Sequence, residues 1–416
     1  FNAASRQNGW FRMQANESRV YFETRTPTVY GEALTHVELD FGGCAGAGSA
    51  TDCSDENRST NSWLPRLRLA YGTLGGFMAG QNWVPGNDLA ASPEIFDFFG
   101  DVGQWGYARV PQIGYKTALP WVPNGATIGA YLVQPNGALA TPLGGIESDT
   151  ALTNNPPGVG GLVNGDIANL AFNPLKDPLP DGALVLNWEQ RWGHFQLHSV
   201  VRDMEMQDGH FLSQEYIGYG GGFSAAVHPA WFGWTKDNLG FQAFAGEGLS
   251  HWGSNWTGAD TNTTQALASN YGGPGLYGNA TAAGCTPGTT LVTFAAAKCT
   301  TAAPTTAAAA AAIRTTTVPS WGGEVNYQHW WTPTLRSTAT FGIGHQDIPT
   351  NLIAPTGITA ANFNYNKELI TAHLNLIWSP VPFINTGFEY TYDRRQTVWN
   401  QHGQGQVLDF DFLVKF

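Results

Sequence analysis

The chain has 416 residues, of which only 12% are charged and 13% are aromatic, with 51 glycines and a formal net charge of −12. The negative charge argues against a nucleic-acid partner, and charged residues make up well below the usual share of about a quarter. No apolar run reaches the about 18 residues of a transmembrane helix. Glycine- and aromatic-rich chains with short alternating strands and no such run point to transmembrane β-barrels.

Alternation of apolar and polar residues predicts β-strands in several parts of the chain. The expected strands, in chain order, are residues 18–26, 31–41, 66–73, 76–83, 184–192, 194–203, 368–379, 383–395 and 406–416. In the last strand, Leu408, Phe410 and Phe412 fall on one face, and Asp409 and Asp411 fall on the other. A soluble sandwich would also alternate. A last strand with aromatics at alternate positions, ending on Phe416, is more specific and resembles the C-terminal signal of bacterial outer-membrane barrels.

The connections between the expected strands are alternately short and long. The long ones are residues 42–62, 84–106, 134–182, 250–319 and 346–363. Such loops are uncommon in compact soluble domains, whereas outer-membrane barrels combine short periplasmic turns with long extracellular loops. We therefore predict a single all-β domain over residues 1–416, a transmembrane antiparallel β-barrel in which all of these connections except 84–106 are extracellular loops.

The connection 84–106 differs from the others because it mixes acidic and aromatic residues. It carries Asp88, Glu94, Asp97 and Asp101, the last three of them within or beside the run Ile95–Phe99. A solvated loop has little use for an aromatic run, so we expect residues 84–106 to fold inward as a constriction loop. Its acidic residues would then form one wall of a narrowed, water-filled pore. The alternative is a surface loop or a small helix over a soluble core.

Basic residues in or beside the strands are candidates for the rest of the pore lining. An arginine that flanks water inside a barrel keeps its charge and creates a positive field. The candidates are Arg19, Arg25, Arg66, Arg68, Arg109, Lys116, Arg191, Arg202, Arg336 and Arg395. Opposed charges across the gap would orient dipolar solutes. The alternative is that the arginines are held in wall salt bridges with Glu23, Glu38 and Asp40.

The cysteines and histidines point to structural roles. The four cysteines form two local pairs within loop-like stretches, which favours the disulfides Cys44–Cys53 and Cys285–Cys299 in an oxidising compartment. His194 and His198 share one strand face, but partner ligands at metal-binding spacing are missing, so lumen lining is the better interpretation. We expect neither a metal nor a cofactor.

Four segments carry a resemblance to a known family: SRVYFETRTPTVYGEALTHVELDF (18–41), RLRLAYGTLGGFMAGQNW (66–83), EIFDFFGD (94–101) and RVPQIGY (109–115). They look like the DcaP-like outer-membrane porins. The resemblance implies a homotrimer of barrels of about 16 strands that takes up small, mainly anionic solutes such as dicarboxylates. Gly114 stands where it predicts a second basic residue, with Lys116 as a possible substitute, so strong anion selectivity is not expected.

The sequence thus predicts a porin of the bacterial outer membrane, in contact with outer-membrane lipids and lipopolysaccharide. It would allow passive diffusion of small hydrophilic solutes, anionic or zwitterionic. One alternative is a structural or anchoring barrel with a largely closed pore, whose long loops bind a surface layer or a partner protein. Another is an outer-membrane enzyme, for which the sequence offers no nucleophile motif.

Overall fold

The protein is described here by a computed structural model. It describes residues 15, 18–43, 64–97, 100–106, 108–122, 125–135, 138–141, 144–147, 175–176, 178–207, 213–233, 235–249, 252–253, 276–278, 315–347, 366–397 and 400–415. Strands dominate these ranges, with a short 3₁₀ turn η2 (Trp231–Gly233). No helix in these ranges is long and apolar enough to cross a membrane.

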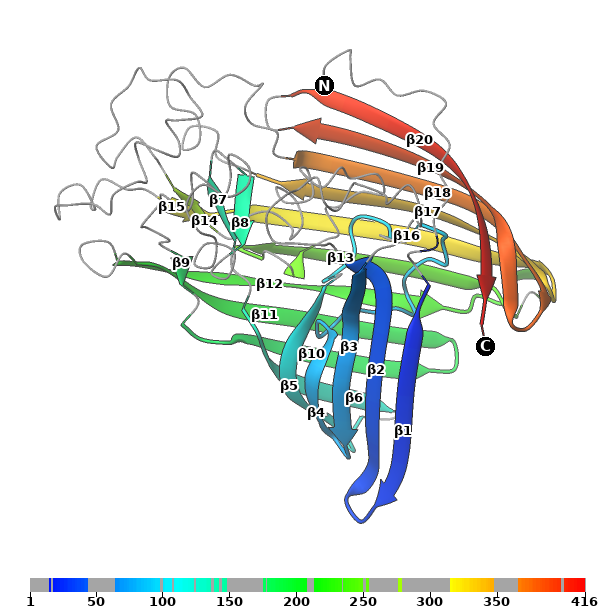
Figure 1. Ribbon diagram of the computed structural model, residues 1–416, viewed down its shortest axis with the longest axis horizontal. Coiled ribbons are helices and arrows are strands. Elements are labelled where there is room, and N and C mark those ends of the chain that lie inside the picture. Colours follow the sequence, from blue (N-terminus) through cyan, green and yellow to red (C-terminus); the bar gives the residue numbers. More distant parts are fainter. Residues whose placement is uncertain are drawn as a thin grey trace.

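Most strands belong to one 16-stranded sheet whose neighbours are antiparallel (Figure 1). In sheet order they are β1 (Val20–Thr28), β2 (Gly31–Gly43), β3 (Leu64–Leu74), β4 (Phe77–Trp83), β5 (Arg109–Ala118), β6 (Ala126–Val133), β10 (Asp181–Gln190), β11 (Gly193–Gln207), β12 (Ser213–Val227), β13 (Asn238–Glu247), β16 (Pro319–Thr332), β17 (Leu335–Gln346), β18 (Asn366–Val381), β19 (Ile384–Thr397) and β20 (His402–Val414), with β9 (Leu175–Lys176) paired to β11. The predicted all-β antiparallel fold is confirmed, and every sequence-predicted strand overlaps a strand of this sheet.

Two of the predicted long loops contain strands of their own. A separate four-stranded sheet has the order β15 (Thr315–Thr317), β14 (Leu276–Gly278), β7 (Ala138–Thr141) and β8 (Gly144–Glu147). These four short strands lie within the connections predicted at 134–182 and 250–319. Strands of three or four residues are too short to show a readable alternation in the sequence.

The large sheet curves back on itself. The N–H of Val102 donates to Oγ1 of Thr371 on β18 at 3.1 Å, and β5 begins only seven residues later, at Arg109. β18 lies eight pairings from β5 along the sheet, or about 38 Å in a flat sheet with strands about 4.8 Å apart. Seven residues span at most about 25 Å. The sheet therefore wraps around this segment, as the curved strands in Figure 1 show.

The two faces of the sheet differ in chemistry. On β19, Phe388 and Tyr390 are exposed, whereas Glu389 and Thr391, which alternate with them, are buried. The exposed side chains continue across the sheet, because Phe388 pairs with Leu376 on β18 and with Phe410 on β20. An apolar face open on the outside and a polar face turned inward is the pattern of a barrel in lipid.

A small apolar core lies on the inner face of the sheet. Its wall residues come from β5, β6, β10, β11 and β13, and its remaining members come from segments between strands: Val84, Trp105, Val110, Val133, Ala183, Val200, Phe244, Leu249 and Trp252. The segment 84–106 therefore packs against one side of the interior. Val84 and Trp105 belong to this core, so both ends of the segment 84–106 are held in it.

Candidate functional site: the inward loop and the charged inner face

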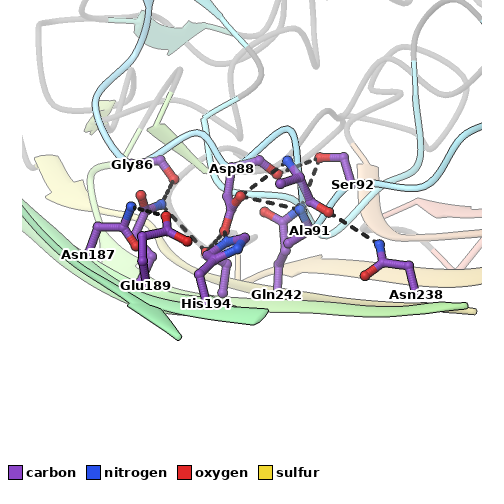
Figure 2. A network of polar contacts seen from close by, with 12 residues as sticks. Gly86, Asp88, Ala91, Ser92, Asn187, Glu189, His194, Asn238 and Gln242 are labelled. Atoms are coloured by element: carbon purple, nitrogen blue, oxygen red, sulfur yellow. Dashed lines mark hydrogen bonds and ion pairs between the residues drawn. The ribbon is translucent and has the colours of Figure 1, made fainter. Parts of the chain in front are cut away.

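Residues 84–106, here called the inward loop, are attached to the inner face first by Asp88 (Figure 2). Oδ2 of Asp88 lies 2.7 Å from Nε2 of His194 on β11 and accepts the Oγ–H of Ser224 on β12 at 2.5 Å. Burial would raise the pKa of Asp88, but the bonds from His194 and Ser224 outweigh it and lower the pKa below its usual value. The carboxylate therefore stays ionised as a wall anchor.

The next residues of the inward loop lie directly on the backbone of the wall. The carbonyl of Ala91 accepts Nδ2–H of Asn326 on β16 at 2.7 Å. A Cβ atom at Gly240 of β13 would lie only 2.2 Å from the same carbonyl oxygen. Nε2 of Gln242 donates to Oγ of Ser92 at 3.1 Å. A side chain at position 240 would lift the loop, so glycine there permits the close approach.

Glu94 then pairs with the wall of β17. Its carboxylate is bound by the guanidinium of Arg336 through two nitrogens, with Nε to Oε2 at 2.6 Å. Nε2 of Gln328 donates to the same Oε2 at 2.7 Å. Arg336 also stacks on the ring of Trp330, with Cζ 4.9 Å from the ring centroid. A bidentate pair fixes orientation as well as position.

Glu389 of β19 binds the backbone of the loop. Its two carboxylate oxygens accept the N–H groups of Phe96 at 2.8 Å and Asp97 at 3.1 Å. Asn375 donates to Glu389 at 3.0 Å, and Nδ1 of His373 lies 3.2 Å from it. A wall carboxylate therefore accepts two consecutive, partly buried N–H donors of the loop.

The last acidic residue of the loop, Asp101, is fully buried. Its carboxylate accepts the hydroxyl of Thr340 on β17 and the N–H of Val102. Burial raises the pKa of Asp101 to about 7. The following Gly103 has a φ of 92°, and a Cβ atom there would lie 2.2 Å from the carbonyl oxygen of Gly323. Only glycine fits this position without strain.

All four predicted loop acids are thus in contact with the wall: Asp88 and Asp101 are buried, and Glu94 is paired with Arg336. Asp97 is half-buried and bound through its N–H. The expectation that these acids face the arginines of the first strands across a gap is not what these contacts show. Of the aromatic run, Phe96 is half-buried, and Phe98 and Phe99 lie outside the described residues.

The arginines of β1 and β3 form a charged network with acids of β1 and β2. Nε of Arg25 bonds Glu23 at 2.7 Å, and Arg66 and Arg68 both bond Oδ2 of Asp40, at 2.6 and 2.9 Å. Arg68 also reaches Glu38, and Arg25 reaches Glu32. These are the wall salt bridges that the sequence left open as an alternative. Arg25 is nevertheless 56% exposed and Arg66 is 34% exposed, so both guanidinium groups remain partly accessible to solvent.

The other predicted basic residues occupy different places. Arg19 precedes β1 and is exposed. Arg109 shares the strand face of exposed Pro111 and Ile113 and stacks on Trp83 at 4.7 Å, so it lies on the outward face. Lys116 is exposed and shares the opposite face with Gln112. Arg191 lies in the turn between β10 and β11, not on a strand. Arg202, Arg336 and Arg395 lie at strand positions that face inward, as predicted, and the first two are buried.

The histidines of β11 lie beneath the inward loop and do not line open space. His194 bonds Asp88, and His198 is buried and stacks on Trp105 with ring centroids 4.3 Å apart. Asp88, His194 and Ser224 do not form a nucleophile–base pair, because the serine hydroxyl bonds the carboxylate and not the imidazole. Within the described ranges, no group of three or more His, Cys, Asp or Glu residues is arranged to hold a metal.

Several wall anchors were not singled out from the sequence, namely Ser224, Asn326, Thr340, Thr371, Asn375 and Glu389. Alternation places Thr371, Asn375 and Glu389 on the polar face, but it does not say which polar residues a loop will cover. The predicted disulfides Cys44–Cys53 and Cys285–Cys299, and the terminal Phe416, lie outside the described residues.

Comparison with known proteins places the fold. No family model matches the chain, and no curated protein matches it. The outer-membrane channel DcaP of Acinetobacter baumannii matches with a TM-score of 0.62 at 16% identity, over 97% of this chain and 86% of that chain. Salmonella typhi OmpF gives 0.47 at 11% identity, over 95% and 89%. The chain has the fold of the DcaP channel, and at the level of fold the expected resemblance is confirmed.

Proposed function

We propose that this chain is a porin of the bacterial outer membrane that lets small hydrophilic solutes diffuse passively. One observation carries the proposal: the inward loop crosses the polar inner face of a curved sheet whose outer face is apolar and exposed. In lipid, a closed sheet pairs its backbone groups internally and needs an apolar exterior. A polar interior that a loop narrows but whose charged side chains stay partly exposed is suited to water and solutes.

The charges of β1 to β3 support a mixed, weakly anion-leaning interior. Arg25 and Arg66 keep free surface although both are paired, and a paired guanidinium still offers donors to a carboxylate. Lys116 adds a further exposed cation. Glu23, Glu38 and Asp40 offset much of this charge. We propose that anionic organic acids such as dicarboxylates, and zwitterionic solutes, pass more readily than cations, without strong exclusion.

The proposed assembly is a homotrimer embedded among outer-membrane lipids and lipopolysaccharide. Large apolar side chains are exposed on the outward face of β4 and β5, including Phe77, Ile113 and Tyr115. Phe77 and Tyr115 pack together with ring centroids 4.6 Å apart. Such a surface is costly in water and is suited to acyl chains or to a neighbouring subunit. The proposal includes no enzymatic step.

A second candidate is a structural or anchoring barrel whose pore is largely closed and whose long loops bind a surface layer or a partner protein. One observation favours it: the apolar core of Val84, Trp105 and Trp252 fills one side of the interior with buried apolar side chains. Such a core removes that side from the water-filled cross-section. The two candidates differ in whether the remaining side of the interior, along β1 to β3, is open to water.

Recording of the purified protein in planar bilayers tests both. The porin predicts discrete conductance steps, and under a KCl gradient a reversal potential that indicates a small preference for chloride. A clear cation preference would contradict the anion-leaning interior. Absence of steps from folded, inserted protein would contradict the porin and favour the anchoring barrel.

A further inference from the structure

A second segment enters the interior beside the inward loop. After β13 ends at Glu247, Gly248 donates its N–H to the carbonyl of Val318 at 3.1 Å. Leu249 and Trp252 are then buried, at 1% and 0% exposure. Both belong to the apolar core on the inner face of β5 to β13. We call the described residues 248–249 and 252–253 the latch.

Trp252 joins the latch to the end of the inward loop. Its carbonyl accepts the N–H of Gly106 at 3.0 Å, and Trp105 forms a β-bridge with Gly253. The rings of Trp105 and Trp252 lie 5.8 Å apart. Within the loop itself, Nε1 of Trp105 donates to the carbonyl of Pro85 at 2.9 Å, and Nδ2 of Asn87 donates to the carbonyl of Gly106 at 3.1 Å. The latch therefore ties the loop end to the sheet.

A buried ion pair ties the latch to the wall in turn. Nε of Arg202 on β11 donates to Oδ2 of Asp181 on β10 at 2.9 Å, and both side chains are 0% exposed. Nη1 of Arg202 donates to the carbonyl of Gly248 at 2.7 Å. Nε1 of Trp252 donates to Oδ2 of Asp181 at 2.6 Å. One carboxylate and one guanidinium thus bind both ends of the latch.

A buried ion pair of this kind adds little net stability by itself, because desolvation offsets the attraction. Its specific value lies in geometry, since a carboxylate that holds both an arginine and an indole N–H allows one arrangement of the three groups. Arg202 has the inward phase of a pore-lining residue but is completely covered. Its charge is used to place the latch, and solutes do not meet it.

We infer that Trp252 is a positioning residue for the constriction: with Asp181 and Arg202 it fixes the end of the inward loop and seals the interior along β5 to β13. Solutes then pass along β1 to β3 alone. This inference rests on the proposed pore. It also explains why Val84, Trp105 and Val110, which lie where the loop joins β4 and β5, are buried although they face the inside of a porin-like sheet.

Single-channel conductance and liposome swelling with neutral sugars of increasing size test the inference in the full-length protein. Trp252→Ala removes the ring, the Asp181 bond and the packing on Trp105. It is expected to raise the conductance at least about twofold and to admit larger sugars, because the sealed side opens. Trp252→Phe, which keeps a ring but loses the N–H donor, should give an intermediate increase. Trp121→Ala is the matched control, because Trp121 is 75% exposed.

Conductance and size cut-off report the position of the loop. If Trp252 only stabilised the fold, its replacement would lower the unfolding midpoint but leave the conductance and the size cut-off unchanged. Folded Trp252→Ala with wild-type conductance and cut-off overturns the inference. Should that variant fail to fold, Trp252→Phe and Asp181→Asn decide, and wild-type values in both overturn it. A silent wild type with a conducting Trp252→Ala would contradict the proposed pore yet support the latch. Silence in both contradicts the two together.

Discussion

Asp88 and His194 lie 106 positions apart in the sequence, yet Oδ2 of the aspartate is 2.7 Å from Nε2 of the histidine. The bond joins the inward loop to the middle of the curved sheet, and Ser224 adds a second donor to the same oxygen. Contacts of this kind recur at Glu94, Asp101 and, from the wall side, Glu389. The loop is therefore held along its length by polar anchors, and each anchor can be removed by one substitution.

Asp88→Ala should loosen the start of the loop. It leaves the buried donors of His194 and Ser224 without their acceptor, which costs about 1–3 kcal/mol. The free energy of unfolding in detergent measures the effect. Ser224→Ala removes one bond to the Asp88 carboxylate and a longer one, of 3.5 Å, from Nε2 of Gln196. It is expected to cost less than Asp88→Ala. Equal stability of Asp88→Ala and the wild type would show that the anchor is absent in solution.

Glu94 and Arg336 should be energetically coupled. Because the Glu94 side chain is 40% exposed, solvent screening reduces the interaction to about 1 kcal/mol. A double-mutant cycle with Glu94→Gln and Arg336→Gln measures it in the unfolding free energy. Additive single effects would contradict the pair. Arg25 and Glu23 on β1 give a comparison cycle with a smaller expected coupling, because Arg25 is 56% exposed whereas Arg336 is 5% exposed.

Glu389→Gln should free the backbone of the loop at one place. The amide of glutamine offers one oxygen where the carboxylate offers two, so Phe96 and Asp97 cannot both keep their acceptors. Hydrogen exchange at these two N–H groups is expected to speed up by on the order of tenfold, the equivalent of about 1.4 kcal/mol. Exchange of strand amides in β2 serves as the internal control. Unchanged protection of residues 96 and 97 would refute the contact.

The Asp101 segment should be held more firmly at mildly acidic than at alkaline pH. Burial raises the pKa of Asp101 to about 7, above the about 3.9 of an unfolded aspartate. The folded state therefore binds the proton of Asp101 more tightly than the unfolded state does. The stability that this protonated carboxyl group contributes is complete below about pH 4 and is lost as the pH rises through about 7. Exchange of the amides of residues 100–103 is expected to be faster at about pH 8 than at about pH 5, after correction for intrinsic rates.

Asp101→Asn removes that titration and should make the protection of residues 100–103 insensitive to pH over the same interval. Asp88 has the opposite sign, because its pKa is lowered in the folded state. Its contribution is present above the unfolded value of about 3.9 and is lost as the pH falls through the lower folded value. The two anchors therefore act together near about pH 5. A pH response that persists in Asp101→Asn would assign it to another group.

Gly342→Ala should lift the loop from the wall without changing its charge. A Cβ atom at Gly342 of β17 would lie 2.1 Å from the carbonyl oxygen of Val102, so the loop backbone must move. A loop backbone displaced from the wall moves further into the pore, so the expected result is a lower single-channel conductance with little loss of barrel stability. Gly405→Ala on β20 is the control, because its nearest neighbours lie at 4.0 Å. Equal conductance of both variants would place Val102 away from the wall.

Much of the fold could be read from the sequence, because alternation with period two depends only on one face being apolar. It worked where side chains alternate clearly, as in β19 and β20. Alternation did not indicate a strand where glycines are frequent, as at Gly218 and Gly220–Gly222 of β12, because glycine has no side chain to mark a face. The composition of residues 84–106 indicated an inward position, although it did not indicate the partners on the wall.

The site was less predictable because coverage is a tertiary property. Arg202 and Arg25 both have an inward phase, yet Arg202 is completely buried under the latch and Arg25 is 56% exposed. Nothing local distinguishes them, since the cover comes from Gly248 and Trp252, far along the chain. The loop acids were expected to face the gap, but a carboxylate beside wall donors such as Arg336 gains more from bonding them.

Single-channel conductance shows directly whether the inward loop narrows a water-filled pore. The comparison is between the wild type and a variant in which residues 89–102 are replaced by a short glycine–serine linker. Asp88 and Trp105 remain in that variant, so both attachment points of the loop are kept. A pore narrowed by the loop predicts discrete steps in the wild type and severalfold larger steps in the variant. Identical conductance in two folded, inserted proteins, or silence in both, would contradict it.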